Sequence, residues 1–454
     1  MNLLVKDRKF YKSFFSMTGV IAVQNLITFA VNLADNVMIG GYSQTALSGV
    51  AIVNQIQFLL QMLMLGTGSA IGVLSAQYWG KKELEPIRKA TSVGVSLGVI
   101  ISLVMMLVVF IFPTQVMGLL TNEQAVIQEG SKYLVIICFS YVLFAVSNNL
   151  LSALRSVETV KIGFVVNLIA LVVNIVLNYG LIYGRLGMPE MGVEGAAIAT
   201  LSARVVEFVV VVLYVLIWDK KICWRLRNLL HIDKVMFKDF IHVGMPLILA
   251  NGIWGVAMSV QTAILGRLGN DTIAANSIAT TVFQVVSVVT YAAGNASSVI
   301  IGKTVGEGDI PRVKAYTKTM QILFIGIGVI TGLVLYSSTD LIIGLYDVTP
   351  AAAELSRQFI LVLSFTVVGT SYQCSCLTGI VTGGGDTKFV LINDLIHQWL
   401  IVIPAAFLSA FVFHGPLWLT FACLKADQVL KCFVAIVKVN RYSWIHVLTR
   451  ENNE

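Results

Sequence analysis

A single carboxylate inside a long apolar stretch is the clearest candidate for chemistry in this sequence. Asp35 is the only ionisable side chain between Val20 and Val37, within a stretch long enough to cross a lipid bilayer. A charge near the bilayer centre costs about 2.5–3.5 kcal/mol, so it is retained only with a partner or a task. Asp35 is therefore either a proton or metal-cation site, or a solvated or hydrogen-bonded carboxylate at a helix end.

Oxygen-bearing side chains on two later apolar stretches are expected at the depth of Asp35. Asn174 and Asn178 are four residues apart and share one helix face. Counting inward from the outer ends at 1.5 Å per residue places Asp35, Asn178 and Thr200 at one level, ~9–10 Å deep, with Asn174 one turn deeper. Their oxygens suit Na⁺ or a relayed proton, so we predict a cation site from these four residues. The alternative is ordinary hydrogen bonding between membrane helices, worth about 0.6 kcal/mol per pair.

Two further charged pairs lie inside apolar stretches. Arg204 and Glu207 are three residues apart, so we expect them to form a structural ion pair. Asp394 and His397 have the same spacing. Asp394 is a secondary candidate for protonation, although a pair solvated from the cytoplasm is the simpler interpretation.

The composition excludes an ordinary water-soluble enzyme. Of the 454 residues, 57% are hydrophobic and only 12% are charged, against about 25% charged in soluble domains. The six cysteines show no metal-binding or disulfide pattern. The segment Gly302-Lys303-Thr304 resembles the end of a phosphate-binding loop but lacks the earlier glycine and the strand. We therefore expect no nucleotide, no cofactor and no enzymatic activity.

The apolar stretches predict an all-α integral membrane protein with twelve transmembrane helices. Splitting the chain at its polar breaks gives spans at 14–41, 50–78, 90–112, 131–152, 162–184, 193–217, 240–267, 277–301, 318–338, 355–381, 390–412 and 416–437. An even number of spans places both termini on one side of the membrane.

The basic residues predict which side that is. Of the 31 Lys and Arg residues, 24 lie in the terminal segments and in the loops on the terminal side, and only four lie in the opposite loops. By the positive-inside rule both termini are cytoplasmic, in a multi-pass protein of the cell inner or plasma membrane. Because the basic residues are spread over loops rather than gathered on one face, nucleic acid is not an expected partner.

The two halves of the chain resemble each other at an offset of 226 residues. Gly80 matches Gly306 at this offset, and similar matches recur over roughly 120 residues. We therefore predict two pseudo-symmetric six-helix lobes, residues 1–217 and 240–454, joined by a basic cytoplasmic linker, 218–239. Asp35 falls on Gln261, a secondary candidate in the second lobe. Because the carboxylate belongs to one half only, symmetric scaffolding does not require it.

The sequence resembles the MATE (multidrug and toxic compound extrusion) transporters over about residues 12–447. The resemblance depends on the segments NLADNVMIGGYSQTALSGVA, AQYWGKKELEPIRKA, VNIVLNYGLIYGRLGMPEMGVEGAAIATLSARVVE, GMPLILAN, ILGRLGNDTIAANSIA, GGGDTKF and INDLIHQWLIVIPAAF. It implies two six-helix lobes and export of lipophilic, cationic organic compounds in exchange for H⁺ or Na⁺.

The resemblance also implies roles for individual residues. Asp35 matches the family's first-helix carboxylate, and Asn174, Asn178 and Thr200 match the cation-site positions of the first lobe. Asp386 resembles a second-lobe carboxylate of the NorM-like branch. That branch also has a glutamate on the seventh helix, which is absent here, so the pattern favours the DinF-like branch.

Three other classes of membrane protein are weighed against this interpretation. A lipid-linked oligosaccharide flippase would need several intramembrane cations to bind pyrophosphate, and a major-facilitator-type metabolite carrier would also have two six-helix halves. A membrane-embedded enzyme would need clustered acids or histidines at one depth. The favoured interpretation is a monomeric antiporter whose partners are a small amphipathic organic substrate and membrane lipids.

Overall fold

The chain folds almost entirely into helices. The computed structural model describes residues 4–230, 233–344, 346 and 348–450. Within these residues the only β pairing is an isolated bridge between Gly385 and Ile445. The α-helices are α1 (Arg8–Tyr42), α2 (Gln44–Lys81), α3 (Leu84–Ile111), α4 (Pro113–Gly118), α5 (Gln124–Ile137), α6 (Ser140–Ser156), α7 (Lys161–Tyr183), α8 (Gly192–Leu213), α9 (Lys234–Gly266), α10 (Asn270–Gly306), α11 (Ile310–Ile343), α12 (Pro350–Cys374), α13 (Thr387–Leu395), α14 (Ile403–Phe407), α15 (Leu417–Leu424) and α16 (Asp427–Arg441).

Short π-helical and 3₁₀ segments interrupt or extend several of these helices. The π segments are η1 (Tyr214–Trp218), η3 (Ser375–Val381), η4 (Ile396–Val402) and η5 (Leu408–Val412), and η2 (Leu226–Leu230) is a 3₁₀ helix. Single π turns inside α-helices occur frequently at functional sites. The segments η3, η4 and η5 all lie in the second half of the chain.

The predicted all-helical membrane fold is confirmed. Within the described residues, ten helices are long and apolar enough to cross a membrane, and the pair α5–α6, bent by 52°, makes an eleventh. The predicted span 416–437 is not one helix. It is divided into α15 and α16, because Lys425 leaves helical geometry with φ −108° and ψ 6°. Lys425, Asp427 and Lys431 also make this span less apolar than the others.

The helices form two compact units. The amino-terminal unit contains residues 23–75 and 83–244, and the carboxy-terminal unit contains residues 1–22, 76–82 and 245–454. The start of α1 and the end of α2 thus pack with the carboxy-terminal unit. The predicted division into residues 1–217 and 240–454 assigns these segments to the first lobe.

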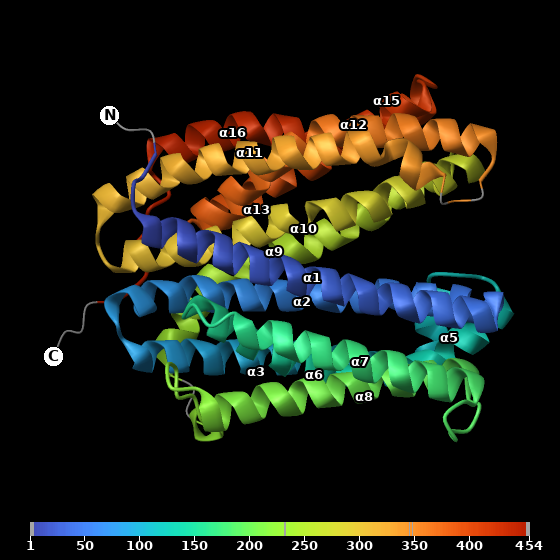
Figure 1. Cartoon of the computed structure of the whole chain (residues 1–454), viewed down its shortest axis with the longest axis horizontal. Helices are drawn as coiled ribbons and strands as arrows, with labels where there is room; N and C mark the ends of the chain where they lie inside the picture. Colours follow the sequence, from blue (N-terminus) through green and yellow to red (C-terminus); the bar gives the residue numbers. More distant parts are fainter. Residues whose placement is uncertain (1–3, 231–232, 345, 347, 451–454) are drawn as a thin grey trace. The chain divides into compact units, whose positions relative to one another are not determined.

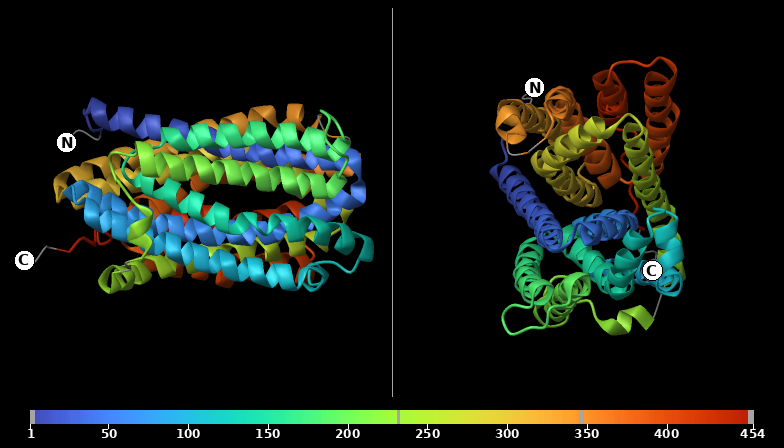
Figure 2. Two further views of the ribbon diagram at one scale, coloured as in Figure 1. Left: turned by 90° about the horizontal axis from the view of Figure 1, so that it is seen from below. Right: turned by 90° about the vertical axis from the view of Figure 1, so that its right-hand side faces the viewer.

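In the amino-terminal unit the long helices run side by side (Figure 1). Helix α7 packs on α8, α3 on α6, and both α5 and α6 on α8. The right-hand view of Figure 2 shows the green helices α7 and α8 end-on. The predicted linker is folded onto this unit, because the Trp224 indole donates a hydrogen bond to Ser92 Oγ at 2.8 Å.

The helices present large apolar side chains on their outer surface. On α3 these include Leu103, Val104, Leu107 and Ile111, each at least 41% exposed. A water-exposed apolar surface of this extent is unfavourable by about 25 cal/mol per Å². A lipid environment removes that cost, as the membrane fold requires.

In the carboxy-terminal unit, two glycines related by the sequence repeat allow a close helix crossing. Gly80 at the end of α2 lies against the Lys303 carbonyl, and Gly306 at the end of α10 lies against the Gln77 carbonyl. Gly306 follows Gly80 by 226 positions, and Lys303 follows Gln77 by the same number, so the two contacts are related by the sequence repeat. A side chain at either glycine would overlap the opposite backbone.

This crossing predicts a site-specific cost of adding one methyl group. Gly306→Ala should destabilise the protein by about 1–3 kcal/mol, the usual cost of overpacking. Gly326→Ala on α11 is the matched control, because a Cβ there meets nothing within 4 Å and alanine is the better helix former. Thermal unfolding of both purified variants in detergent measures the difference. Equal melting temperatures would contradict the proposed close crossing.

Candidate cation site

Helices α1, α7 and α8 of the amino-terminal unit position the predicted cation-site residues. Helix α7 ends at Tyr183, and the next residue, Gly184, has a positive φ of 62° that turns the chain back toward α8. Helix α1 is fixed to α7 near both ends of the site. The Tyr183 hydroxyl donates to the Met38 carbonyl at 2.6 Å, and Gln24 Nε2 donates to the Val160 carbonyl at 3.2 Å.

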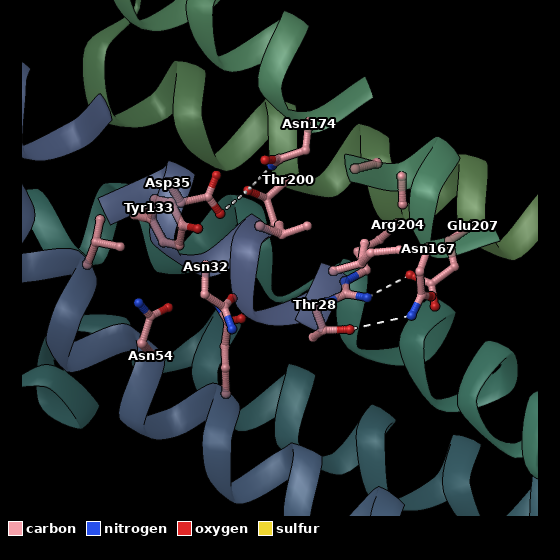
Figure 3. A pocket seen from close by; sticks show the side chains of 16 residues that line it. Thr28, Asn32, Asp35, Asn54, Tyr133, Asn167, Asn174, Thr200, Arg204 and Glu207 are labelled. Atoms are coloured by element: carbon pink, nitrogen blue, oxygen red, sulfur yellow. Dashed lines mark hydrogen bonds and ion pairs between the residues drawn. The ribbon is translucent and has the colours of Figure 1, made fainter. Parts of the chain in front are cut away.

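The four predicted residues meet in a closed ring of hydrogen bonds. Asn178 Nδ2 donates to Asp35 Oδ1 and, at 3.2 Å, to Asn174 Oδ1. Asn174 Nδ2 donates to Thr200 Oγ1 at 3.2 Å, and the Thr200 hydroxyl donates to Asp35 Oδ2 at 3.4 Å. Figure 3 shows Asp35, Thr200 and Asn174 converging from their three helices. All four residues are buried, with Asn174 and Asn178 fully so.

The ring matches the ionised form of the carboxylate. Each Asp35 oxygen accepts one hydrogen bond, which is the arrangement that stabilises a negative charge. Asn178 Oδ1 is buried and accepts no hydrogen bond. A buried unpaired acceptor is costly, and here it belongs to a side chain already bonded to Asp35. The site thus contains one unused acceptor for an added proton or cation.

A small polar cavity of about 40 Å³ adjoins the ring. One water needs about 10–15 Å³, so the cavity holds roughly three waters or a small cation, whereas drug-sized ligands need about 300–1,000 Å³. Figure 3 shows the side chains that line it. The lining residues are Ile27, Thr28, Val31, Asn32, Asp35, Val50, Asn54, Gln57, Tyr133, Asn167, Ala170, Asn174, Thr200, Ala203, Arg204 and Glu207.

Arg204 and Glu207 form the predicted ion pair, with Arg204 Nη1 2.6 Å from Glu207 Oε2. The Arg204 guanidinium also lies 5.0 Å from the centre of the Phe144 ring. The sequence did not indicate that both residues line the same cavity as Asp35. With Asp35 ionised, two acids and one base give this cavity a net charge of −1.

Six polar residues of the cavity were not singled out from the sequence, namely Thr28, Asn32, Asn54, Gln57, Tyr133 and Asn167. Asn54 and Gln57 on α2 are followed by Gln61, and this spacing of three and four residues marks a polar face on an otherwise apolar helix. That periodicity could have identified them. Tyr133 on α5 is almost fully buried, and a lone tyrosine in an apolar segment gives no comparable signal.

The secondary candidates all lie in the carboxy-terminal unit, and none of them lines this cavity. Gln261 is buried on α9. Asp386 caps the start of α13 by accepting from the Phe389 amide at 3.3 Å, and it forms an ion pair with Lys438 at 2.6 Å. Asp394 pairs with Lys431 at 2.8 Å.

Asp394 therefore does not pair with the residue suggested by the sequence. His397 Nδ1 lies 2.9 Å from the Asn393 carbonyl of its own helix. Local spacing could not reveal Lys431 as the partner, because Lys431 comes from α16. Within the described part of the chain no cluster of three or more His, Cys, Asp or Glu side chains could hold a metal ion.

An all-helical membrane protein with a buried, hydrogen-bonded carboxylate beside a small polar cavity is organised as a transporter rather than as an enzyme. The sequence profile of the MatE family matches residues 21–180 and 246–408. The chain therefore belongs to the MatE family of multidrug efflux transporters.

Named relatives and solved structures are similar over nearly the whole chain. The probable multidrug resistance protein NorM of Listeria monocytogenes is 24% identical over 437 residues, covering 95% of this chain and 94% of the relative. Its namesake from Photorhabdus laumondii is 27% identical over 392 residues, covering 86% and 85%. A mutant of the Vibrio cholerae MATE transporter VcmN has the same fold, with a TM-score of 0.87 at 16% identity over 97% of this chain and 98% of that one. The eukaryotic MATE transporter AtDTX14 gives 0.85 at 18% identity over 97% of both chains.

Breaking the Arg204–Glu207 ion pair should lower the stability of the protein strongly, and removing both charges should restore most of it. Arg204→Leu leaves Glu207 buried without its cation and should cost about 3 kcal/mol, whereas the double variant with Glu207→Leu should recover most of it. Lys132→Leu is the control, because Lys132 pairs with Glu129 at the same spacing on an exposed surface, where such pairs add little to stability. Thermal unfolding in detergent measures all three. Equal losses for Arg204→Leu and Lys132→Leu would contradict the prediction.

Proposed function

We propose that this chain is an antiporter that exports lipophilic, cationic organic compounds from the cytoplasm in exchange for a cation that binds at Asp35. The observation that carries the proposal is the closed hydrogen-bond ring, which holds an ionisable group in an apolar bundle beside a cavity of ion size. An intramembrane acid that is kept in this way is a functional site by default. Asn174, Asn178 and Thr200 are its proposed ligands.

The ring favours H⁺ over Na⁺ as the coupling ion. Both asparagine Nδ2 groups are used as donors within the ring. Sodium needs oxygen ligands, so both amides would have to rotate before it could be coordinated. A proton on Asp35 needs one acceptor, and rotation of Asn178 alone supplies its unused Oδ1. The proton therefore breaks fewer of the existing hydrogen bonds.

The proposed cycle depends on the charge of Asp35. With the protein open to the outside, Asp35 takes up a proton and loses the negative charge that attracts a cationic substrate. The substrate leaves, the protein reorients, and deprotonation toward the cytoplasm resets the site. Exchange requires only that proton and substrate prefer different states. The cavity beside Asp35 is too small for the substrate itself, which must bind elsewhere.

The finer assignments follow from the same residues. We propose the DinF-like arrangement, with coupling concentrated in the first half, although the relatives in the comparison are named NorM. We propose that the protein lies in the inner or plasma membrane, that both termini are cytoplasmic, and that the chain is a monomer. An oligosaccharide flippase is less well supported, because two of the three intramembrane cations, Arg204 and Lys431, are paired with acids. That leaves Lys425 to bind pyrophosphate, which would need several cations.

Efflux from vesicles tests the coupling. In vesicles loaded with a fluorescent organic cation, a pH gradient should drive efflux of the cation. Acidifying the compartment that Asp35 faces should raise the rate of this efflux. Asp35→Asn should reduce gradient-driven transport at least about tenfold, equivalent to ~1.4 kcal/mol. Glu123→Gln, which removes an exposed acid between α4 and α5, is the matched control.

Two results would overturn parts of this proposal. If Asp35→Asn retained its full pH dependence, Asp35 would not be the coupling group. If only a Na⁺ gradient at equal pH drove transport in the wild-type protein and Asp35→Asn abolished it, the site would stand but the ion would be Na⁺.

A further inference from the structure

The carboxy-terminal unit contains a second group of charged side chains, two of them buried and one half-buried, which no part of the proposed function uses. Lys431 on α16 lies between two carboxylates. Its Nζ is 2.8 Å from Asp394 Oδ1 on α13 and 3.5 Å from Asp427 Oδ2, one turn earlier on α16. The Lys431 and Asp427 side chains are only 5% and 4% exposed. Two acids therefore share one ammonium group inside a membrane-spanning bundle.

The two acids are held differently. Gln428 Nε2 donates to both oxygens of Asp427 at 3.0 Å, and Gln373 donates to Gln428 Oε1 at 2.8 Å. Asp427 is thus stabilised as an anion by neutral donors as well as by Lys431. Asp394 has Lys431 as its only hydrogen-bonding partner in the described part of the chain. If Lys431 moved fully to Asp427, Asp394 would lose that partner.

The other ionisable groups nearby do not neutralise Asp394. Cys374 on α12 is near all three charges, and Tyr291 on α10 is near Asp427. Lys425 interacts electrostatically with Asp427, and its ammonium lies 5.6 Å from the Phe421 ring centre. His397 bonds to the Asn393 carbonyl. The Asp394–Lys431–Asp427 triad therefore carries a net charge of −1 when both acids are ionised.

A pocket of about 10 Å³ opens beside Asp394. Gln398 and Trp399, from the π-helical segment η4, line it together with Asp394 and Trp254 of α9. Gln398 is 2% exposed, and both its Nε2 and the Trp399 indole Nε1 are buried donors without an acceptor. The pocket has room for about one water, which typically makes about three hydrogen bonds at a buried polar site. Two unused donors and one carboxylate match that requirement.

The triad is not a product of the sequence repeat. At the offsets of 226 and 228, the three charged positions fall on apolar residues of the first half, namely Leu168, Leu201, Val205, Val166, Ala199 and Ala203. Symmetric packing of the helices therefore does not require these charges. Charged residues in a membrane are costly and mark ion pathways or proton relays.

We propose that Asp394 is a second proton-binding group, which receives its proton from water in the Gln398–Trp399 pocket while Lys431 passes from Asp394 to Asp427. The proton arrives on the pocket water as hydronium, adds to the Asp394 carboxylate and leaves a neutral water behind, which brings the triad from −1 to zero. The ammonium stays charged throughout and only changes its partner. The pocket is too small for an organic cation. The role of this proton in transport rests on the proposed exchange function, but the binding itself does not.

Tryptophan fluorescence of the purified protein in detergent reports on this proton without a substrate, because Trp399 and Trp254 line the pocket. Wild-type protein should show a pH-dependent change that is lost in Asp394→Asn, reduced in Trp399→Phe and kept in Asp35→Asn. Glu123→Gln is the matched control, because it removes an exposed acid of the amino-terminal unit and leaves all three charges of the triad in place.

Removing the ammonium separates a proton site from a structural ion pair. Without a nearby cation the ionised acid is less stable, so Lys431→Met should move the midpoint of the fluorescence change upward by at least about one pH unit. An unchanged titration in Asp394→Asn, or an unmoved midpoint in Lys431→Met, would overturn the proposal.

A transport assay then connects the two sites. Removing one of two coupled protons should make the pH dependence of efflux less steep in Asp394→Asn than in wild-type protein. An equally steep dependence would exclude Asp394 from coupling. Failure of the Asp35 proposal is recognised separately, because Asp35→Asn would then transport normally whatever the fluorescence of the Asp394 variant.

Discussion

The constraint on which the rest of this structure depends is the cost of holding unbalanced negative charge among membrane helices. Each compact unit holds two acids and one base that are buried or half-buried: Asp35 and Glu207 with Arg204, and Asp394 and Asp427 with Lys431. Charges removed from water are tolerated only with excellent geometry and additional hydrogen bonds. Both groups supply these, and both remain one cation short of neutrality. That missing cation is what an ion-coupled transporter can exchange.

The helix that carries Asp35 belongs to both units. Residues 8–22 of α1 pack with the carboxy-terminal unit, and residues 23–42 with the amino-terminal one. The hydrogen-bond ring attaches the second of these parts to α7 and α8. A change in the charge of Asp35 thus acts on an element that is continuous through both units. In the proposed cycle, a proton on Asp35 would act on the conformation of the transporter through this helix.

The fold and the ring could be predicted because both depend on signals that a sequence contains directly. Apolar length gives the spans, and counting residues from the ends of the spans places Asp35, Asn178 and Thr200 at one depth. The partners of Asp394 and the cavity-lining Tyr133 could not be predicted. Their contacts depend on how helices far apart in the sequence rotate about their axes, and periodicity does not fix that rotation. The break at Lys425 was missed because a few charged residues in an apolar span do not by themselves reveal where a helix ends.

The most direct test of the central claim is an infrared difference spectrum of the purified protein between alkaline and acidic pH, recorded in the range of the carboxylic acid C=O stretch. We predict a band from a protonated, buried carboxyl group in the wild-type protein, and its selective loss in Asp35→Asn while the remaining carboxyl bands persist. A spectrum in which Asp35→Asn removes no band would show that Asp35 does not gain a proton in this pH range, and it would contradict the account.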